Sequence, residues 1–319
     1  MHNRPDFSLW HGRPYHSLHA FCLNMYHEKL YKIAIDAGMT CPNRDGTCGS
    51  RGCIFCSMGG SGDFAVRAGG RPVSEQIREG LSLFHGKKTG SRFIAYFQAY
   101  TNTYAPVEQL ETLYTQALSS SEIAGISIAT RPDALPCEVL ILLTRLKAAF
   151  PDKFIWIELG LQTIHEKTAS YIRRGYSLPC FTEAVSALKQ RGFPIIVHII
   201  LGLPGETDIQ MYETIELLNT LPVSGIKLQL LHVLKGTDLA ADYETGAFQT
   251  LTMEHYTALV IHCLEQLRPD IVIPRLTGDG PENLLIAPKW SLQKRRVLNH
   301  IHHTMHTQNT WQGKHCQIS

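Results

Sequence analysis

Residues 194–233, PIIVHIILGLPGETDIQMYETIELLNTLPVSGIKLQLLHV, contain the pattern that decides the fold. The apolar runs at 194–202 and 225–233 are almost continuous and rich in β-branched residues, which is typical of strands buried on both faces. Between them, apolar positions recur at helical spacing and predict a helix over 208–220. We therefore expect one strand–helix–strand unit of a parallel sheet in this stretch.

The same unit repeats toward the N-terminus. Four more strand-like runs occur about one strand–helix unit apart, after a first interval lengthened by a cysteine-rich segment: 32–37 (KIAIDA), 92–99 (RFIAYFQA), 123–130 (IAGISIAT) and 154–159 (FIWIEL). Helices are predicted between the strands at 73–86, after Pro106, after Pro136 and at 178–190, where Ser177 is a suitable N-cap. Six consecutive units favour an α/β fold with a partial or complete parallel β/α barrel of the TIM type, expected as (β/α)6.

The repeating pattern also suggests the domain organisation. We expect an N-terminal segment at 1–30, a barrel core at 31–236, and a C-terminal α/β extension at 237–319 that packs on the barrel. In the extension the pattern weakens to a helix, a strand-like run, a glycine-rich turn and a last helix, at 254–267, 270–276, 278–281 and 291–305.

Composition narrows the class of protein. The chain has 319 residues, 44% of them apolar, and a formal net charge of +2, so it has no compositional reason to stay unfolded. No apolar run reaches the roughly 18 residues that a membrane span needs. Residues 1–30 carry charged side chains where a secretory signal would be apolar, so we expect a cytoplasmic protein without a membrane segment.

Four of the nine cysteines lie close together, in CPNRDGTCGSRGCIFC at 41–56. The odd total and the missing signal argue against a disulfide framework. Cys53 and Cys56 are two residues apart and can bind one metal centre, and the glycines before them let a third cysteine reach it. The spacing allows two kinds of site: structural zinc held by all four cysteines, Cys48 included, or an iron–sulfur cluster held by three thiolates with one iron left open.

Cys41-x11-Cys53-x2-Cys56, with Phe55 before the last cysteine, resembles the radical S-adenosylmethionine (radical SAM) enzymes, and its long first spacing resembles their YhcC/YtqA-type subfamily. Further motifs of that subfamily occur along the chain: CPNRDGT (41–47), SGDFA (61–65), AYFQAYTNTYAPVE (95–108), SIATRPD (127–133), ELGLQT (158–163), HVLKGT (232–237) and TGDGP (277–281). In this pattern Cys48 is a spare thiol; if it were a ligand, the spacing would become Cys48-x4-Cys53-x2-Cys56 and Cys41 would be spare.

Polar side chains gather where the predicted strands end, which is the edge of a barrel that carries catalytic and cofactor groups. Glu158, Gln162 and His198 would cost roughly 1–3 kcal/mol or more each if they were buried without partners, so we expect them to face a polar ligand. Tyr100 and Tyr104 are expected as aromatic packing at the rim, and the histidine-rich 300–306 as a helix with exposed histidines.

The resemblance implies two cofactors and a set of residues that bind them. Cys41, Cys53 and Cys56 would hold a 4Fe-4S cluster, and S-adenosylmethionine would lie beside it. The expected S-adenosylmethionine site has Thr101, Asn102 and Thr103 at the amino group, Glu158 and Gln162 near the ribose, Arg174 at the carboxylate, and Arg131 and His198 close by. Simpler structural roles are possible for three of these arginines: Arg131 can pair with Asp133, and Arg173 and Arg174 can form a solvated surface pair.

The resemblance also implies an activity. A reductant protein of the flavodoxin or ferredoxin type would reduce the cluster, and S-adenosylmethionine would be cleaved to methionine and a 5′-deoxyadenosyl radical. TRPD, LGLQT and the Gly-Leu-Pro-Gly turn also resemble the radical domain of the Elongator catalytic subunit, which implies transfer RNA as the partner. The expected reaction converts 5-carboxymethylaminomethyl-uridine at the wobble position to 5-aminomethyl-uridine. A radical SAM enzyme acting on a small metabolite or a protein, and a zinc-stabilised RNA-binding protein without redox activity, remain as alternatives.

Overall fold

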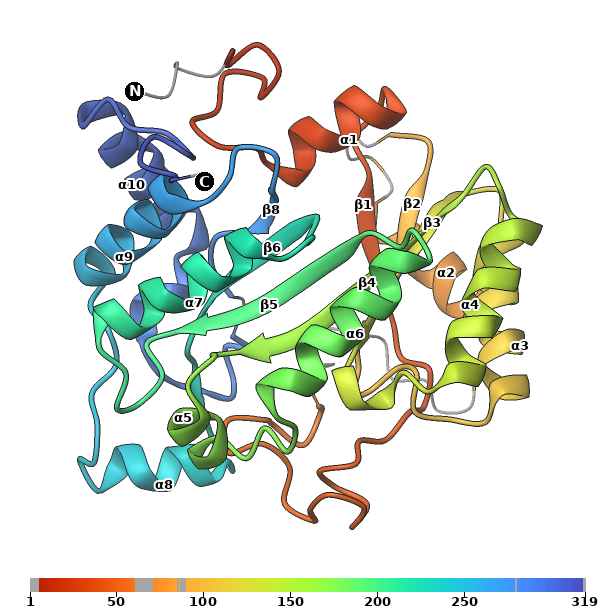
Figure 1. Cartoon of the computed structure of the whole chain (residues 1–319), viewed down its shortest axis with the longest axis horizontal. Coiled ribbons are helices and arrows are strands. Elements are labelled where there is room, and N and C mark those ends of the chain that lie inside the picture. Colours follow the sequence, from red (N-terminus) through yellow and green to blue (C-terminus); the bar gives the residue numbers. More distant parts are fainter. Residues whose placement is uncertain (1–5, 61–70, 85, 87–89, 279, 318–319) are drawn as a thin grey trace.

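The computed structural model describes residues 6–60, 71–84, 86, 90–278 and 280–317. The SGDFA segment at 61–65 and Asp279 of TGDGP lie outside the described residues. Seven parallel strands form one curled sheet, a half-barrel, which confirms the expected fold class (Figure 1). In their order across the sheet, the strands are β1 (Tyr31–Ile35), β2 (Phe93–Phe97), β3 (Ile123–Thr130), β4 (Phe154–Gln162), β5 (Ile195–Leu201), β6 (Gly225–Leu230) and β8 (Val272–Arg275).

Helices cover the outer face of the sheet and close one of its ends. They are α1 (Leu18–Tyr26), α2 (Val73–Ser82), α3 (Val107–Leu118), α4 (Cys137–Ala149), α5 (Glu166–Tyr171), α6 (Leu178–Gln190), α7 (Asp208–Thr220), α8 (Asp238–Glu244), α9 (Met253–Gln266) and α10 (Lys294–Thr307), with short 3-10 turns at Pro132–Ala134 and Lys289–Leu292. Local signals set several starts: the hydroxyl of Ser177 accepts the Cys180 amide at α6, and Thr207 and Gln210 form a capping box at α7. Within the described residues, no helix combines the length and the apolarity that crossing a bilayer requires.

The seventh strand differs from the expectation. The sequence pattern places the run 270–276 in an extension outside a six-stranded barrel, but β8 joins the sheet beside β6, with Lys227 opposite Arg275. Only four residues of the run pair as a strand, and two of them are half-buried, so the local pattern is weak. A smaller antiparallel pair, β7 (Val233–Leu234) with β9 (Leu285–Ala287), lies outside the main sheet.

The inner face of the half-barrel changes from apolar to polar along the strands. At the amino ends, Ile94, Trp156 and Ile196 pack with Cys22 of α1 and form an apolar plug. Two residues further along the same strands, and therefore on the same face, come Tyr96, Glu158 and His198. The plug thus closes one end of the half-barrel, and the next layer of inward-facing side chains is polar.

Candidate active site

A cavity of about 260 Å³ opens at the carboxyl ends of the strands. The loop that follows β1 forms one wall, with Cys41, Cys53 and Cys56, and the strands supply the rest. Of the residues predicted to bind a cofactor, those that line the cavity are Thr101, Arg131, Glu158, Gln162, Arg174 and His198. The fold therefore brings most of the predicted site together, although its members come from six different segments of the chain.

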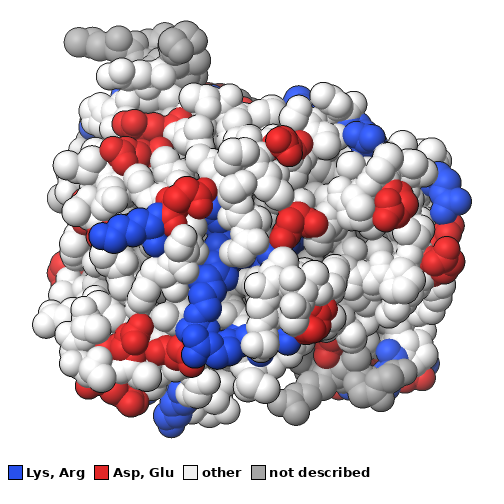
Figure 2. Space-filling model, turned by 60° about the horizontal axis from the view of Figure 1, so that its bottom comes forward, with Lys and Arg blue, Asp and Glu red and all other residues white. Residues whose placement is uncertain are grey.

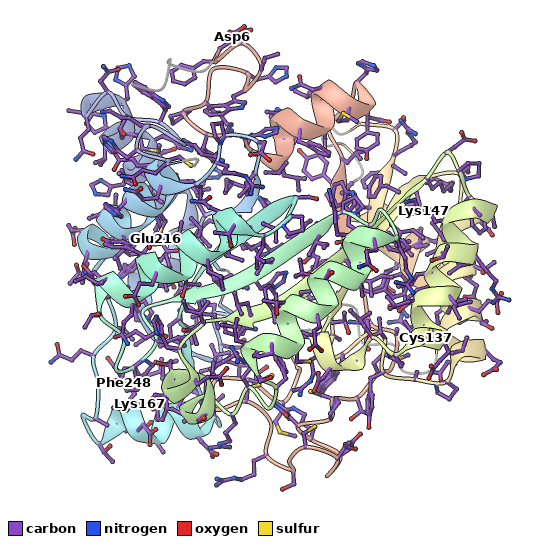
Figure 3. All side chains as sticks on the ribbon, in the orientation of Figure 1. Asp6, Cys137, Lys147, Lys167, Glu216 and Phe248 are labelled. Carbon is purple, nitrogen blue, oxygen red and sulfur yellow. The ribbon has the colours of Figure 1, made fainter. Side chains whose placement is uncertain are left out.

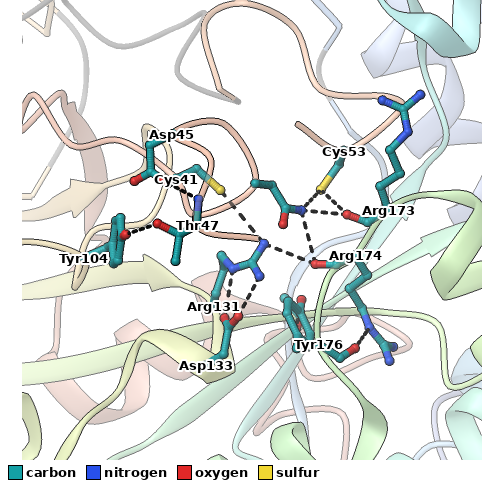
Figure 4. A network of polar contacts seen from close by, with 12 residues as sticks. Cys41, Asp45, Thr47, Cys53, Tyr104, Arg131, Asp133, Arg173, Arg174 and Tyr176 are labelled. Carbon is teal, nitrogen blue, oxygen red and sulfur yellow. Dashed lines mark hydrogen bonds and ion pairs between the residues drawn. The ribbon is translucent and has the colours of Figure 1, made fainter. Parts of the chain in front are cut away.

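The cysteine loop is held in place by its own turns and by the segment after α5. The Cys56 amide donates to the Cys53 carbonyl over 3.0 Å, which closes a tight turn between these two cysteines. The Asn43 side chain donates to the Cys53 sulfur over 3.3 Å and to the Arg173 carbonyl over 2.6 Å (Figure 4). All three predicted ligands are cysteines outside any disulfide that line the cavity, whereas Cys48 is exposed and lies on a separate groove.

The other cysteines take no part in this wall. Cys137, for example, is exposed at the start of α4 on the periphery of the molecule (Figure 3). The cavity therefore gathers three of the nine cysteines, the number that leaves one iron of a cluster without a protein ligand.

The donor chemistry of the wall suits an iron–sulfur cluster. Burial, together with the neighbouring Cys56 and Cys41 thiols, raises the pKa of Cys53 to about 12, so its thiolate needs an electrostatic partner such as a metal. Asn43 donates to Cys53, and Arg131 Nη1 lies 4.0 Å from the Cys41 sulfur. In the arrangement described here, no three His, Cys, Asp or Glu side chains converge on the position of a single metal ion.

Arg131 links the cysteine wall to strand β3. Its guanidinium makes two hydrogen bonds to Asp133, of 2.9 and 2.6 Å, and a third of 3.1 Å to the Arg174 carbonyl (Figure 4). The structural pair with Asp133 therefore exists, and it holds the same guanidinium on the cavity wall. Arg131 can therefore pair with Asp133 and line the cofactor cavity at the same time.

The position of Arg174 fits neither of its two expected roles, which were to bind the carboxylate of S-adenosylmethionine or to lie in solvent on the surface. It is 1% exposed, and its guanidinium is already engaged by protein acceptors: the carbonyls of Tyr176, Leu161 and Thr163, and the Glu166 carboxylate. These bonds tie the end of β4 to the segment after α5. Its neighbour Arg173 pairs instead with Asp238.

Glu158 is the centre of a buried ion network. Oε1 accepts from Lys32 and Ser127, each over 2.6 Å, while Oε2 accepts from His198 over 2.6 Å and from Lys227. With both oxygens engaged, Glu158 acts as a counter-ion, which differs from the expected contact with a ribose. Sequence reasoning missed Lys32 and Lys227, although a lysine within the apolar runs KIAIDA and GIKLQLLHV was the available signal.

The protonation of this network follows from its burial and its charges. Burial raises the pKa of Glu158, but Lys227 and Lys32 outweigh that effect and hold it well below its ordinary value, so Glu158 is ionised. Burial and Lys227 lower the pKa of His198 to about 4, so His198 is neutral near pH 7. Gln229 donates to His198 Nδ1 over 3.2 Å, and His198 Nε2 donates to Glu158, as a neutral imidazole requires.

In the turn after β2, two of the three residues expected to bind S-adenosylmethionine form hydrogen bonds within the protein. Thr101 lines the cavity, but the Asn102 amide donates to the carbonyls of Phe97 and Ala129, and Thr103 shares a hydrogen bond of 2.5 Å with Thr130. The last two side chains therefore point into the protein and shape the turn. Tyr104 bonds Thr47 over 2.9 Å and so steadies the cysteine loop from the rim (Figure 4).

Two residues that line the cavity have a strained backbone. Tyr100 and Gln162 have φ values of 60° and 65°, in the left-handed region that side chains other than glycine rarely occupy. Gln162 Oε1 is buried and has no hydrogen-bond partner within the described structure. A strained backbone conformation of this kind costs of order 1–3 kcal/mol, persists only where the surrounding structure holds it, and is common at functional sites.

Comparison with known families agrees with this geometry. The family model of the Radical SAM superfamily matches residues 46–218, and that of the Radical SAM C-terminal domain matches residues 223–307. The chain belongs to the radical SAM superfamily, whose enzymes use a 4Fe-4S cluster and S-adenosylmethionine, and these are its cofactors.

Individual relatives place the chain within the superfamily. The protein YtqA of Bacillus subtilis is 42% identical over 317 residues, covering 99% of this chain and 97% of YtqA. The protein YhcC of Escherichia coli K12 is 37% identical over 265 residues, covering 83% of this chain and 84% of YhcC. The chain thus groups with the YhcC/YtqA proteins, as its cysteine spacing suggested.

A solved structure shows the same fold. Elp3 of the archaeon Methanocaldococcus infernus, lacking its N-terminal residues 1–46, matches with a TM-score of 0.66 and 15% identity, covering 89% of this chain and 64% of that chain. At this identity the likeness concerns the fold alone.

Proposed function

We propose that this radical SAM enzyme acts on transfer RNA and converts 5-carboxymethylaminomethyl-uridine at the wobble position to 5-aminomethyl-uridine. The observation that carries the proposal is the cavity at the carboxyl ends of the strands, where three cysteines of one loop share the lining with polar and cationic side chains. The choice of substrate follows the motif resemblance to the YtqA-type proteins and to the radical domain of the Elongator catalytic subunit, and the similarity to YtqA extends over 99% of this chain.

The cysteine wall is the proposed cluster site. Cys41, Cys53 and Cys56 would hold the cluster, with Asn43 donating to one of its sulfur ligands. When bound, the cluster and S-adenosylmethionine together supply a 5′-deoxyadenosyl radical for hydrogen abstraction. The protein contributes binding and orientation, and it excludes water from the reacting atoms.

S-adenosylmethionine would occupy the part of the cavity beside this wall. Thr101, Arg131 and Gln162 face that space, and the unpartnered Gln162 oxygen is available to accept a hydrogen bond from a ligand. Arg174, Asn102 and Thr103 would position this region through their contacts with the backbone. Glu158 and His198 would form its polar floor.

Arginine side chains near the cysteine loop suit an RNA partner. Figure 2 shows a run of Lys and Arg side chains down the middle of the face drawn, with acidic side chains on both sides. Arg44 lines the cavity, and Arg51, on the separate groove that also contains Cys48, has 72% of its side chain exposed and lies 3.6 Å from Asp238. Arginine side chains can contact the phosphates of a nucleic acid. The electron would come from a reductant protein of the flavodoxin or ferredoxin type.

The decisive experiment is mass spectrometry of the wobble nucleosides in transfer RNA from a strain lacking the protein. We expect 5-aminomethyl-uridine and nucleosides made from it to disappear and 5-carboxymethylaminomethyl-uridine to accumulate. Restoring the wild-type gene, or Cys137→Ser as a matched control away from the cavity, should reverse the change. Cys41→Ala, Cys53→Ala and Cys56→Ala should not.

Other outcomes contradict the proposal in distinguishable ways. Unchanged nucleosides, together with reductive cleavage of S-adenosylmethionine by the purified protein, would indicate a metabolite or protein substrate. A colourless anaerobic preparation that contains zinc and no sulfide would indicate a structural zinc protein. Loss of the cluster in Cys48→Ser but not in Cys41→Ala would move the first ligand from Cys41 to Cys48.

A further inference from the structure

A line of hydrogen bonds runs from the buried carboxylate of Glu158 to a side-chain amide on β6. His198 Nε2 lies 2.6 Å from Glu158 Oε2, and His198 Nδ1 lies 3.2 Å from the side-chain nitrogen of Gln229. Gln229 is two residues beyond Lys227 on β6, so both side chains are on the inner face of the half-barrel. Glu158, His198 and Gln229 all line the cavity, and the line ends at Gln229.

The charges of the network give this line one direction. Against the effect of burial, Lys227 and Lys32 hold the pKa of Glu158 well below its ordinary value, so the ionised carboxylate can only accept. His198 Nε2 therefore donates to Glu158. Burial and Lys227 lower the pKa of His198 to about 4, so the ring is neutral and its Nδ1 is an acceptor. The group opposite Nδ1 must be a donor, and thus the amide nitrogen of Gln229 faces the ring.

The oriented amide leaves two groups for a ligand. A primary amide has one oxygen acceptor and two N–H donors, and His198 takes one of the donors. Within the described residues, the side-chain oxygen of Gln229 makes no hydrogen bond, and the side chain is half-buried on the cavity. Rotating the amide would place its oxygen against the Nδ1 acceptor. The contact with His198 therefore keeps one acceptor and one donor of Gln229 in fixed positions.

Gln229 lies away from the part of the cavity proposed for the cofactors. The cysteine loop follows β1 at one edge of the sheet, whereas β6 is next to β8, the strand at the other edge. The residues proposed to face S-adenosylmethionine, Thr101, Arg131 and Gln162, are at the ends of β2, β3 and β4. With the cofactors placed there, the part of the cavity beside β5 and β6 is left for the substrate.

An imide edge is the ligand that this amide fits. Uracil carries N3–H between two carbonyl oxygens, so each side of N3 offers a donor next to an acceptor. A glutamine amide offers the reverse pair, and glutamine makes paired hydrogen bonds of this kind with the edges of bases. A site built for such a pair rejects a ligand that lacks the donor, because the fixed oxygen is then left without a partner.

We propose that Gln229, oriented by His198 and Glu158, binds the N3–H and an adjacent carbonyl oxygen of the uracil ring of the substrate. The inference rests on the proposed function, in which the substrate is a modified uridine. Gln229 would be the residue that determines specificity for the base. His198 and Glu158 would be positioning residues, which act by holding the amide in one orientation.

The test removes the donor from the ligand. Binding of 5-carboxymethylaminomethyl-uridine and of its N3-methyl derivative is measured by anaerobic equilibrium dialysis against the reconstituted holoenzyme with S-adenosylmethionine. We expect the wild type to bind the unmethylated nucleoside about tenfold or more tightly. Gln229→Met should reduce this ratio, chiefly by weakening the binding of the unmethylated nucleoside. Gln109→Met, at an exposed position of α3, should keep the full ratio.

A second variant tests the positioning role of His198. In His198→Leu the amide keeps its polar atoms but loses the contact that orients it, so the ratio should fall between the values of the wild type and of Gln229→Met. A full ratio in His198→Leu would show that the amide is held without this contact and would contradict the proposed orientation. Should Gln229→Met fail to fold, Gln229→Leu provides the comparison.

The same samples separate the substrate from the cofactor. If Gln229→Met weakens the binding of S-adenosylmethionine and leaves the nucleoside ratio unchanged, the amide faces the cofactor and the proposal is wrong. Equal binding of both nucleosides by the wild type also overturns it. If the wobble nucleosides of the deletion strain are unchanged while the ratio depends on Gln229, the proposed function fails and the uracil subsite stands.

Discussion

Replacing Glu158 by glutamine tests whether the buried network is organised as the structure shows. The change keeps the shape of the side chain and removes its charge. Lys227 would then be left 3% exposed without its carboxylate, and the 2.6 Å contacts of Lys32 and His198 would lose their ionised acceptor. Breaking a buried ion pair by removing one partner costs about 3–5 kcal/mol, so we expect the free energy of unfolding to fall by that amount.

This loss converts into a measurable shift in melting temperature. At about 2.1 cal/mol/K of unfolding entropy per residue, a chain of 319 residues has about 0.7 kcal/mol/K, so Tm should fall by about 4–7 °C. The assay is anaerobic differential scanning calorimetry of matched preparations with equal iron content. Glu216→Gln, at an exposed position of α7, is the control and should change Tm by less than about 1 °C.

A double variant separates the ion pair from general damage. Lys227→Met alone should also destabilise the protein, because it removes one of the two lysines that stabilise ionised Glu158. Combining it with Glu158→Gln removes both partners, so the double variant should lose much less than the sum of the two single losses. Additive losses, or a Glu158→Gln protein as stable as Glu216→Gln, would refute the reasoning.

Two further predictions concern the cysteine loop and pH. In Gly60→Ala the new Cβ would lie 2.3 Å from the Tyr100 ring at a φ of +57°, so the loop should shift and the iron and sulfide content of the anaerobically purified protein should fall. Gly49→Ala, with ordinary contacts at 3.5 Å, should keep full iron content, and a fully loaded Gly60→Ala protein would contradict the loop geometry. The pKa of His198 is lowered from 6.5 to about 4, so between these values the unfolded chain binds a proton that the native state does not. Stability should therefore fall as the pH drops from about 6.5 to 4, by on the order of 3 kcal/mol. His198→Gln should flatten Tm against pH in this window, and an unchanged slope would show that another group is responsible.

Local signals predicted the regular elements well. The helix expected at 208–220 is α7 with the same bounds, and Ser177 caps α6 as expected. These features depend on residues within one or two turns of each other, so apolar spacing and capping residues are sufficient to predict them. The helix α1 was missed because its nine residues carry only a weak apolar stripe, and its packing against the end of the sheet makes it stable.

The sequence predicted which residues lie at the candidate site better than it predicted their hydrogen-bond partners. Cys41, Cys53 and Cys56 share one cavity wall, and most of the polar residues expected to bind a cofactor line the same cavity. Their partners were not foreseen: Arg174 is held by backbone carbonyls, and both oxygens of Glu158 are occupied by side chains of other strands. Hydrogen-bond partners on different strands depend on how the sheet brings those strands together, and the sequence of one segment does not contain that information.

The sequence by itself determined the class of fold, the family and the loop that carries the cysteines, because strand and helix periods and the cysteine spacing are local properties. Only the tertiary structure decided that Lys32 and Lys227, 126 and 69 residues away from Glu158, surround one buried carboxylate, and that β8 pairs with β6 so that Arg275 lies opposite Lys227. The physical reason is the curvature of the sheet. Curling seven parallel strands into a half-barrel turns alternate side chains of distant segments toward one interior, where burial and charge set their roles.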